Sequence, residues 1–528
     1  MTTPPAFHYI FLHEIASQNA LSRHVPKSPE RRVPACQMSQ RLTALMVYPN
    51  RFRPHVMPVG LEYVCNSLDR AGIPFEVADL NFESDEELCR RVTRTKPDLV
   101  GISVRNVDAC YLRHNEFFIP QIRDLVHRIK SCHTCRVVLG GAGYSLFVRE
   151  ILEYTGADFG VAGYGERALP QLVAALEDGG NLSKVDNLVW RRGETLIVNP
   201  STKDGYGEQL PRRRNIMRNR DYYRAFGFGN IEAKRGCYKP CGYCAEPAIV
   251  GRDVLTQDID CILAELRELR EMGITRVHFS DSEFNVGPPK FTRELCKAMI
   301  REKLDLRWTA FVHPEPRSLS PEICRLMREA GCTEITLSVD TGSEKILAGM
   351  GKQHTVDDAV VVSESFKQAG ISLAHTYLVG WPGESVDTLA ETVNFMRRTE
   401  PDFKLVFAGI RILPDTRIAD VAKQQGLVPT DADLLVPSFV NPEQVLSEFL
   451  PYLRRETRGI ANCILPSRGV DFSNLVMQAA YLRGFDGGYA DLMNHIATIS
   501  LREKAAIAWD AARRYLLPEQ TPLIPPAR

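Results

Sequence analysis

Arg235-Gly236-Cys237-Tyr238-Lys239-Pro240-Cys241-Gly242-Tyr243-Cys244 is the stretch that decides how the rest of this chain is interpreted. It places three thiols close enough in sequence to reach one small inorganic centre. A zinc site would need four protein ligands, and the next cysteine, Cys261, lies seventeen residues beyond the third thiol. Three thiolates and one open position suit a four-iron cluster whose fourth iron binds a substrate. A zinc site with a remote fourth ligand, or three unrelated buried thiols, are the alternatives.

The composition predicts a soluble globular protein of two to four domains. The chain has 528 residues, and Lys plus Arg equals Asp plus Glu at 65 each, so no net charge favours nucleic acid or membrane as a partner. No apolar run approaches the ~20 residues of a membrane span, and the first residues do not match a signal peptide. Most of the fourteen cysteines stand singly in apolar or helical patterns, which indicates a reduced, cytoplasmic setting.

Ahead of the cysteines, strands and helices alternate over residues 41–180. This alternation predicts a doubly wound parallel α/β sheet, preceded by a poorly ordered extension over residues 1–40. The expected strands are Leu42–Tyr48, Phe75–Asp79, Leu99–Val104, Arg136–Gly141 and Phe159–Gly163. Such sheets bind ligands at the carboxyl ends of their strands. The loops expected to meet at that rim are Pro49–Pro58, Ser103–Asp108, Gly140–Ser145 and Gly163–Glu166.

A connector over residues 181–230, with a small hairpin, leads to a second alternating region over residues 231–415. Six strand–helix units there predict a partial (β/α)6 barrel related to the TIM barrel, with catalytic groups on the loops that follow the strands. The expected strands are Ile231–Lys234, Arg276–Ser280, Arg307–Val312, Glu334–Val339, Ser372–Val379 and Phe403–Ile412. The cysteines follow the first of them. Residues 416–528 are expected to form a mostly helical C-terminal region.

A cysteine trio with this spacing, on the loop after the first strand of a partial barrel, resembles the radical S-adenosylmethionine (SAM) superfamily. The resemblance implies a [4Fe-4S] cluster held by Cys237, Cys241 and Cys244, with SAM bound to the open iron. Tyr243, an aromatic residue just before the third cysteine, also matches the superfamily pattern.

Later strand ends extend this resemblance. The residues expected to contact SAM are Asp281 and Glu283 after the second strand, Ser338 and Asp340 at the fourth, Gly380 and Gly383 after the fifth, and Arg411 after the sixth. The glycines would let the backbone approach the adenine closely, although a tight turn would use the same residues. A helix cap at Ser343 and a surface ion pair at Arg411 are the alternatives. Tyr377 and Glu283 are candidates for an acid or base by position.

The glycine-rich loops of the first region resemble the cobalamin-binding domain that precedes many radical SAM barrels. The residues expected at the cobalamin are Gly60, Ser103, Arg105, Asn106, Gly140, Gly141, Gly163, Gly165 and Glu166. A dinucleotide fingerprint at Gly163 is weak, because it follows the last strand rather than the first. The first loop lacks the Asp-x-His-x-x-Gly motif whose histidine binds cobalt in many cobalamin domains, so His55 is not expected as a lower ligand.

Ser103-Val104-Arg105-Asn106-Val107-Asp108 is similar to the cobalamin-dependent tryptophan 2-C-methyltransferases. The resemblance implies that Arg105 lies under the cobalt and excludes a sixth ligand. Contact with a cobalamin propionamide or a nearby acid is the alternative for this arginine. No such resemblance covers the C-terminal region, which would select the substrate.

The resemblances together imply a cobalamin-dependent radical SAM methyltransferase of natural-product biosynthesis. It would transfer the SAM methyl group through methylcobalamin to a carbon of a small molecule or peptide precursor, with the indole C2 of tryptophan as one candidate. The transfer would follow hydrogen abstraction by a deoxyadenosyl radical or direct attack of the indole carbon. The alternatives are a cyclase, a ring-contracting enzyme or a mutase with the same domains, and a cobalamin or redox sensor. We expect a monomer that receives electrons from a donor such as flavodoxin or ferredoxin.

Overall fold

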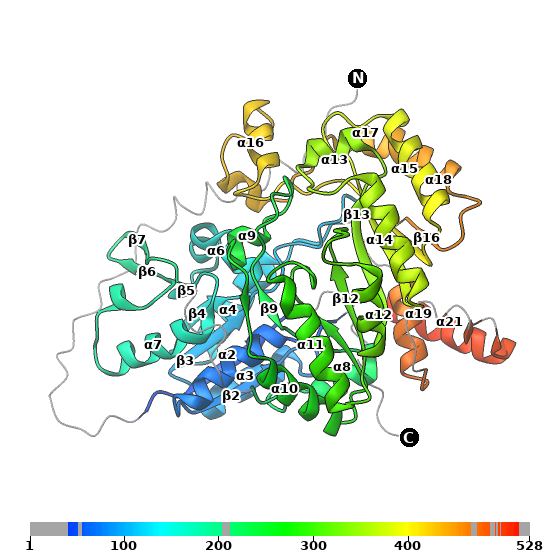
Figure 1. The fold of residues 1–528 in the computed structure, drawn as a ribbon. Helices are drawn as coiled ribbons and strands as arrows, with labels where there is room; N and C mark the ends of the chain where they lie inside the picture. Colours follow the sequence, from blue (N-terminus) through cyan, green and yellow to red (C-terminus); the bar gives the residue numbers. More distant parts are fainter. Residues whose placement is uncertain are drawn as a thin grey trace. The chain divides into compact units, whose positions relative to one another are not determined.

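Two sheets organise the described residues, and the first contains seven strands (Figure 1). Their order is β2-β1-β3-β4-β5-β6-β7. β1 to β5 pair in parallel, and β6 and β7 add an antiparallel hairpin next to β5. Every residue of β1 is buried, as expected for a parallel strand that is covered on both faces. The strands are β1 (Ala44–Tyr48), β2 (Phe75–Asp79), β3 (Leu99–Ser103), β4 (Arg136–Gly140), β5 (Phe159–Val161), β6 (Leu188–Arg192) and β7 (Thr195–Val198).

The computed structural model describes residues 41–50, 55–113, 115–202, 212–465, 472–485, 492, 495–496 and 498–516. These residues all belong to one compact unit, Arg41–Arg528. The extension predicted for residues 1–40 lies outside the described residues, as do four positions of the first predicted loop.

The helices of the first sheet alternate with its parallel strands along the chain. α3 begins with a capping box: the Glu87 backbone N–H donates to the Ser84 hydroxyl, and the Ser84 backbone N–H donates to the Glu87 carboxylate. The helices are α2 (Val59–Arg70), α3 (Asp85–Thr95), α4 (Ile119–Cys132), α5 (Ala142–Leu146), α6 (Val148–Thr155) and α7 (Gly165–Glu177), followed by a 3-10 turn at Leu182–Lys184.

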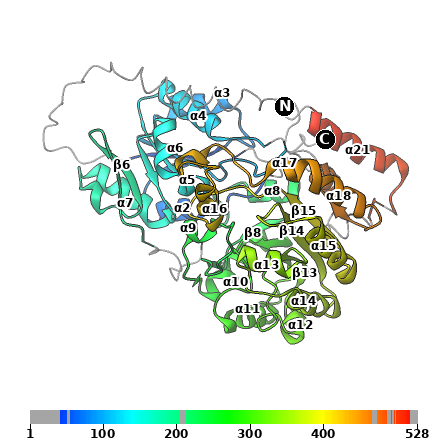
Figure 2. The ribbon, with the colours of Figure 1, turned by 90° about the horizontal axis from the view of Figure 1, so that it is seen from above.

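The second sheet is a curved, all-parallel sheet with the order β16-β15-β14-β13-β12-β11-β8. Figure 2 shows α10, α11, α12, α14 and α15 along the outer side of its strands. The strands are β8 (Gly229–Ile231), β11 (Arg276–Phe279), β12 (Arg307–Val312), β13 (Cys332–Asp340), β14 (Ser372–Val379), β15 (Phe403–Ala408) and β16 (Cys463–Ile464). The helices are α10 (Ile259–Glu271), α11 (Pro289–Glu302), α12 (Pro321–Glu329), α13 (Glu344–Met350), α14 (Val356–Gln368) and α15 (Val386–Thr399).

The remaining elements join or extend these two layers. Apolar side chains of α19 and α21 pack on each other around Tyr481. The elements are α8 (Asn219–Phe226), β9 (Lys234–Arg235), α9 (Glu246–Val250), β10 (Leu255–Thr256), α16 (Arg417–Gln424), a 3-10 turn (Ala432–Leu435), α17 (Pro442–Gln444), a π-helical turn (Val445–Phe449), α18 (Leu450–Glu456), α19 (Phe472–Tyr481) and α21 (Leu501–Leu516). No helix among the described residues is both long and apolar enough to cross a membrane.

The predicted fold class is confirmed, and the structure corrects several element limits. The hairpin expected in the connector is part of the first sheet, because β6 pairs with β5. The strand expected at Ile231–Lys234 ends at Ile231, and β9 instead pairs with β10 in a separate ribbon. The sixth barrel strand ends at Ala408 rather than Ile412. β16 adds a strand from the region expected to be helical.

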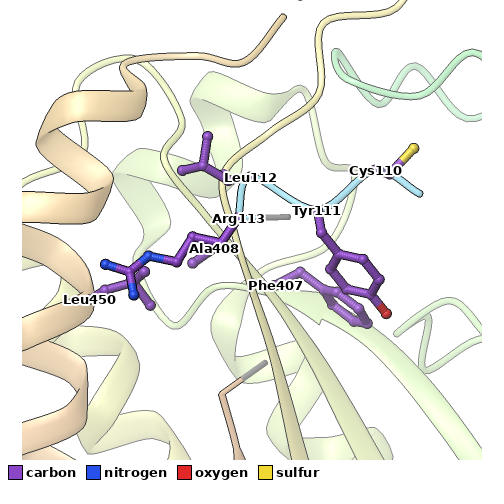
Figure 3. A pocket seen from close by; sticks show the side chains of 8 residues that line it. Cys110, Tyr111, Leu112, Arg113, Phe407, Ala408 and Leu450 are labelled. Carbon is purple, nitrogen blue, oxygen red and sulfur yellow. The ribbon is translucent and has the colours of Figure 1, made fainter. Parts of the chain in front are cut away.

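The loop after β3 packs against the end of β15 (Figure 3). Leu112 lies on Gly409, where an added Cβ would come 2.6 Å from the Leu112 Cβ. A small cavity of about 20 Å³ remains between the loop and the strand, and Figure 3 shows the Tyr111 and Phe407 rings side by side there. The two sheets therefore touch through loops at the carboxyl ends of β3 and β15.

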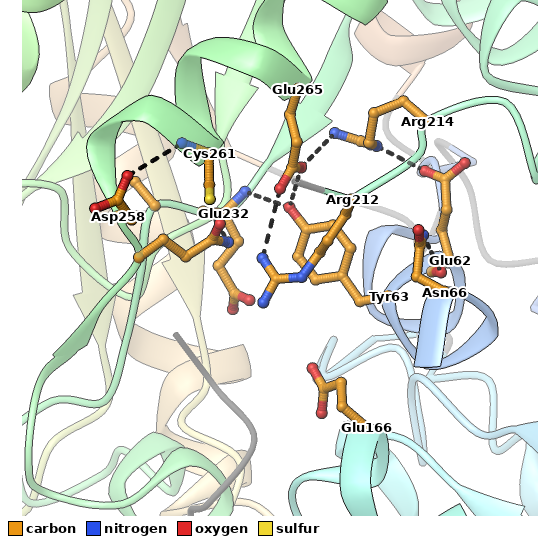
Figure 4. Close-up of polar contacts among 12 residues, drawn as sticks. Glu62, Tyr63, Asn66, Glu166, Arg212, Arg214, Glu232, Asp258, Cys261 and Glu265 are labelled. Carbon is orange, nitrogen blue, oxygen red and sulfur yellow. Dashed lines mark hydrogen bonds and ion pairs between the residues drawn. The ribbon is translucent and has the colours of Figure 1, made fainter. Parts of the chain in front are cut away.

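A second junction is a network of buried charges (Figure 4). Arg214, from the connector, donates to Glu62 of α2 over 2.8 Å and pairs with Glu265 of α10 over 3.4 Å, and all three side chains are fully buried. The Arg212 guanidinium lies 3.9 Å from the centre of the Tyr63 ring, and Tyr63 donates its hydroxyl proton to Glu265. The network ties α2 of the first sheet to α10 of the second.

Replacing Arg214 by Met tests this network. The change leaves the Glu62 and Glu265 carboxylates buried with less positive charge nearby. We expect the free energy of unfolding to fall by about 3–5 kcal/mol, measured by urea unfolding followed by tryptophan fluorescence. Arg213→Met is the matched control. The Arg213 side chain, next to Arg214 in sequence, is 58% exposed and pairs with Asp69. Losing this pair should lower the free energy of unfolding by about 0–1 kcal/mol. An equal fall in the free energy of unfolding in the two variants would contradict the role of Arg214 in joining the two sheets.

Candidate active site

The cysteine loop joins the short ribbon of β9 and β10 to α9. Gly236, which precedes the first cysteine, has φ +109°, and a Cβ there would lie 2.0 Å from the Asp253 carbonyl oxygen. Only glycine fits this position. The backbone N–H of Cys237 donates to the Gly251 carbonyl over 3.0 Å, and the N–H of Cys244 donates to the Cys241 carbonyl over 3.1 Å. The loop is therefore folded tightly by its own backbone.

Two neighbouring segments hold this loop from outside. The N–H of Gly242 donates to the Met350 carbonyl at the end of α13 over 2.7 Å, and the N–H of Ile418 in α16 donates to the Gly242 carbonyl over 2.9 Å. Trp381 packs against the same place, because a Cβ on Gly242 would lie 2.9 Å from its ring. The glycine between the second and third thiols is therefore needed for close packing.

The three thiols lie close enough to influence one another. Burial is the main cause that raises the pKa of Cys237, Cys241 and Cys244; the charge of Cys241 adds to the rise at Cys237, and the charges of Cys241 and Cys237 add to the rise at Cys244. Over the described ranges, no three His, Cys, Asp or Glu side chains converge as they would on a single metal ion. The thiolates of a four-iron cluster each bind a different iron, so this donor set suits a cluster rather than one ion.

A buried polar group lies next to the cysteines at the ends of β11 and β13. Lys352 pairs with Asp340 over 2.7 Å, and both side chains are nearly inaccessible to solvent. The Tyr243 hydroxyl donates to the same Asp340 carboxylate over 2.7 Å. Lys352 also hydrogen-bonds the Cys241 thiol, which lowers the pKa of that thiol. This lysine connects the cysteine loop to the strand ends.

Glu283 lies within the same group and is ready to exchange a proton. Burial raises its pKa to about 7, while the charge of Lys352 and a hydrogen bond with Ser338 act in the opposite direction. Its Oε2 atom and the Nε2 atom of buried His313 have no hydrogen-bond partner among the described residues. Buried polar atoms are normally paired, so these two favour a polar ligand between the strand ends. The residues therefore fit a bound SAM next to a cluster.

Two predicted site residues have partners elsewhere. Asp281 accepts from the backbone N–H groups of Ala233 and Lys234 and pairs with the Lys234 ammonium over 2.8 Å. It thus orders the segment leading to the cysteines rather than facing SAM. Tyr377 is fully buried and contacts His375 and Phe395 of α15, between the sheet and its helices. We therefore assign Tyr377 no role in the reaction.

The residues predicted after β14 and β15 are also placed by this structure. Gly380 and Gly383 have φ +112° and +86° and form a turn, in which the Glu384 carboxylate accepts from the Gly380 N–H. Arg411 was expected to bind a ligand carboxylate or a surface acid. It is buried and instead donates to Asp108 of the first sheet.

A cavity with a volume of about 410 Å³ lies at the carboxyl ends of the first sheet. This volume is within the range of small-molecule sites, roughly 300–1,000 Å³. Residues of all four loops predicted for the rim line it. The predicted residues among them are Gly60, Ser103, Arg105, Gly140, Gly141, Gly163, Gly165 and Glu166, together with apolar side chains such as Met46, Leu61, Val138 and Leu169. The mixture of glycines and apolar surface fits a large, flat ligand such as a corrin.

The second sheet supplies the opposite wall of this cavity. Arg235, next to the cysteine loop, pairs with Glu166 over 3.0 Å and with Glu232 over 2.6 Å. Glu246, two residues after the third cysteine, also lines the cavity and accepts a hydrogen bond from Ser282 over 2.9 Å. The cysteine loop and the cavity are therefore adjacent features of one site.

Among the described residues that line the cavity, Arg105 is the arginine contributed by the first sheet. Its Nη1 donates to Oδ1 of Asn106 over 2.8 Å, and its charge acts on the buried Tyr48 hydroxyl, whose pKa is raised mainly by burial. Asn106 itself does not line the cavity. His55 packs against Phe226 of α8 at 5.5 Å between ring centres and is also not among the lining residues.

Sequence reasoning missed Lys352, Lys234 and the Arg235–Glu166 pair. Their partners stand on other segments of the chain, Asp340 for Lys352, Asp281 for Lys234 and Glu166 for Arg235, and no local sequence pattern marks such a pair. Arg235 carried a usable signal, because it stands directly before the cysteine motif on the strand side.

Two family models match this chain. The model of the Radical SAM superfamily matches residues 231–396, and that of the B12 binding domain matches residues 50–173. The matched segments correspond to the two sheets: the B12 binding model falls on the first sheet, and the Radical SAM model falls on the partial barrel that follows it.

The chain is also similar to individual proteins whose activities are named. The chain is 24% identical to a tryptophan 2-C-methyltransferase of Streptomyces laurentii, over 74% of this chain and 76% of the relative. It is 26% identical to the hopanoid C-3 methylase of Methylococcus capsulatus, over 60% of each chain.

Solved structures share the fold. TsrM of Kitasatospora setae, a radical SAM methyltransferase with tryptophan and a SAM analog bound, superimposes with a TM-score of 0.78 at 23% identity, covering 88% of this chain and all of that one. OxsB, a cobalamin-dependent radical SAM enzyme with aqua-cobalamin bound, gives 0.69 at 14% identity, covering 91% and 73%.

The buried Glu384 carboxyl predicts how the free energy of unfolding depends on pH. Burial raises its pKa to about 7, despite hydrogen bonds from Gly380 and Trp381 that lower it. Because this folded-state pKa is above the ordinary value of 4.5, the folded state binds the proton more tightly. The associated stability is fully present below about pH 4.5 and is lost as the pH rises to about 7.

Glu384→Gln keeps an acceptor for the Gly380 N–H but cannot ionise. We expect its free energy of unfolding to fall less than that of the wild type between pH 5 and pH 8, by up to about 3 kcal/mol. Urea unfolding at both pH values measures the difference. Parallel pH profiles for the two proteins would show that Glu384 does not titrate with this pKa.

Proposed function

We propose that this protein is a cobalamin-dependent radical SAM C-methyltransferase acting on a small molecule or a peptide precursor. The carrying observation is the placement of the glycine-lined cavity directly against the cysteine loop. A domain that binds cobalamin and a loop that binds a cluster have to face a common space for methyl transfer. The names of the relatives in both comparisons support the same activity.

Residues of this chain have distinct proposed roles. Cys237, Cys241 and Cys244 would hold a [4Fe-4S] cluster, and Glu283, Ser338 and Asp340 would contact SAM. The cavity residues Gly60, Ser103, Arg105, Gly140, Gly141, Gly163, Gly165 and Glu166 would hold cobalamin. When bound, SAM would supply the methyl group, the cluster a single electron, and cobalamin a metal that carries the methyl group to carbon.

The protein's own part is positioning and exclusion of water. The Arg105 guanidinium has no lone pair to donate to a metal. At the cavity rim it would therefore not bind the cobalt of a bound cobalamin. Glu283, with a pKa of about 7, lies beside the cysteine loop and can take up or release a proton near neutral pH. Lys352 holds Asp340 and Cys241 in fixed positions.

The substrate is proposed to be tryptophan or a related indole, attacked at C2. This proposal follows from the tryptophan-methylating relatives and from Arg105 at the cavity rim. We also propose a cytoplasmic monomer supplied with electrons by a flavodoxin or ferredoxin. The cysteines of the described residues are all unpaired, which suits a reducing compartment.

Gly140→Val tests whether the cavity binds cobalamin. An added Cβ at Gly140 would meet its nearest neighbour at 3.9 Å, so the side chain would enter the cavity without a clash. We expect the dissociation constant for hydroxocobalamin, from absorbance titration, to rise about tenfold or more. Gly459→Ala, at an open position outside the cavity, is the control and should bind as the wild type does. Unchanged binding by Gly140→Val would place cobalamin elsewhere.

The activity is tested with protein reconstituted with iron, sulfide and cobalamin, then incubated with SAM, a reductant and tryptophan. We expect S-adenosylhomocysteine and 2-methyltryptophan, detected by mass spectrometry. The triple variant Cys237→Ala, Cys241→Ala, Cys244→Ala should lose both products and the brown iron absorbance, while Cys261→Ala, a buried cysteine on α10, should retain them. Absence of deoxyadenosine during turnover would favour attack by the indole carbon over hydrogen abstraction. A wild type that binds no cobalamin would exclude the proposed function.

A further inference from the structure

A buried ion pair connects the loop after β3 to the segment after β15. Nε of Arg411 donates to Oδ2 of Asp108 over 2.9 Å, and the two side chains are only 3% and 1% exposed. The partners are 303 residues apart in sequence. The pair therefore links the B12-binding sheet directly to the sixth strand of the radical SAM sheet.

The second carboxylate oxygen of Asp108 orders its own loop. Oδ1 accepts from the backbone N–H of Cys110 over 2.7 Å and from Nδ2 of Asn115 over 3.2 Å. Further along, the N–H of Phe118 donates to the Val107 carbonyl over 2.9 Å and closes the loop. Asp108 thus uses one oxygen to shape the loop and the other to anchor it on the guanidinium.

Arg411 is itself held from several directions. Its Nη2 donates to the Leu434 carbonyl over 2.7 Å, and its Nη1 donates to the carbonyls of Ile412 and, at 3.5 Å, Ser438. A planar guanidinium with donors engaged on every side has one orientation. The anchor for Asp108 is therefore rigid.

The contact surface around the pair allows little movement. Gly409, two residues before Arg411, has φ +96°, and a Cβ there would lie 2.6 Å from the Cβ of Leu112. The remaining cavity of about 20 Å³ (Figure 3) has room for about one water molecule. The loop is therefore in close contact with the strand end at Leu112 and Gly409.

The loop carries Arg105 to the cavity rim, three residues before Asp108. On the other side of Arg105, the N–H of Val104 donates to the Gly140 carbonyl over 2.7 Å, and the N–H of Gly143 donates to the Val104 carbonyl over 2.9 Å. Arg105 therefore lies between two fixed points, one on its own sheet and one on the radical SAM sheet. We propose that Asp108 and Arg411 are a positioning pair that sets the loop bearing Arg105 over the cavity and so makes cobalamin binding depend on the radical SAM domain.

Stability alone is a weak reason for such a pair. Two buried charges are often no more stabilising than well-packed apolar side chains of similar volume, and the surrounding residues Val107, Ile410 and Leu434 are apolar and buried. An ion pair adds what apolar packing lacks, namely a fixed direction. The proposal rests on the proposed function only in naming cobalamin as the ligand of the cavity.

Asp108→Asn is the test. The amide oxygen of Asn can still accept from the Cys110 N–H, so the loop keeps its internal bonds, but an amide NH₂ then faces Nε of Arg411. We expect hydroxocobalamin to bind about tenfold or more weakly in an absorbance titration. In the protein without cobalamin, backbone amides of residues 104–113 should exchange hydrogen for deuterium faster than in the wild type.

Arg276→Met is the matched control. Arg276 is a buried arginine on β11 that donates to the Gly227 carbonyl and the Tyr481 hydroxyl, away from the cavity. Its loss should lower the unfolding temperature while cobalamin affinity changes by less than about threefold. If Asp108→Asn does not fold, Arg411→Lys replaces it, because lysine keeps the charge but lacks the fork that holds Asp108.

The outcomes separate the two proposals. Weaker cobalamin binding and faster exchange in Asp108→Asn, with neither in Arg276→Met, support the positioning pair. Affinity within about threefold of the wild type, or equal weakening in both variants, overturns it. A wild type that binds no cobalamin overturns the proposed function instead, and the exchange rates of residues 104–113 then decide alone whether the pair positions the loop.

Discussion

The charge of Arg214 is buried without any exposed surface, and the arrangement of the two sheets depends on how that charge is neutralised. Removing one ion from water costs several kcal/mol unless opposite charges and hydrogen bonds replace the solvent. Here the replacements come from α2 of the first sheet and α10 of the second, through Glu62 and Glu265. The arginine belongs to neither sheet, so its neutralisation requires both. The loops at the carboxyl ends of the two sheets are thereby brought around one cavity.

Close backbone approach is the second requirement of this arrangement. Gly236 and Gly242 lie within the cysteine loop, and a Cβ at either would collide with Asp253 or Trp381. Gly141 meets the same limit on the other side of the site, since its Cβ would lie 2.7 Å from the Val104 carbonyl oxygen. The loops that face the cavity are therefore compact because they lack side chains where they cross. That leaves the space between them for ligands rather than for the chain's own atoms.

Much of this fold could be predicted from sequence because buried parallel strands leave continuous apolar runs, and those runs alternate with helices at short spacing. The cysteine loop could be placed because its signal is local. Side-chain direction could not be predicted in the same way. Tyr377 lies within β14, on the same face as His375, and both rings contact Phe395 of α15; the alternation of this strand did not reveal which of its faces points to the helices. The bulge between Leu337 and Asp340 also shifts the register next to it.

Pairings over long distances were also beyond sequence reasoning. Arg411 was expected at SAM or in a surface ion pair, whereas its partner is the buried Asp108, 303 residues away, and no local pattern connects the two. Which buried carboxyls have a cation of their own follows from such pairings. Asp281 has Lys234 and Asp340 has Lys352, whereas Glu283 shares the field of Lys352 with Asp340. A carboxyl without a dedicated cation changes protonation near neutral pH at little cost, which is the property that an acid or base requires. Among these three carboxyls beside the cysteine loop, the distribution of cations therefore separates Asp281 and Asp340, which order the site, from Glu283, which can exchange a proton.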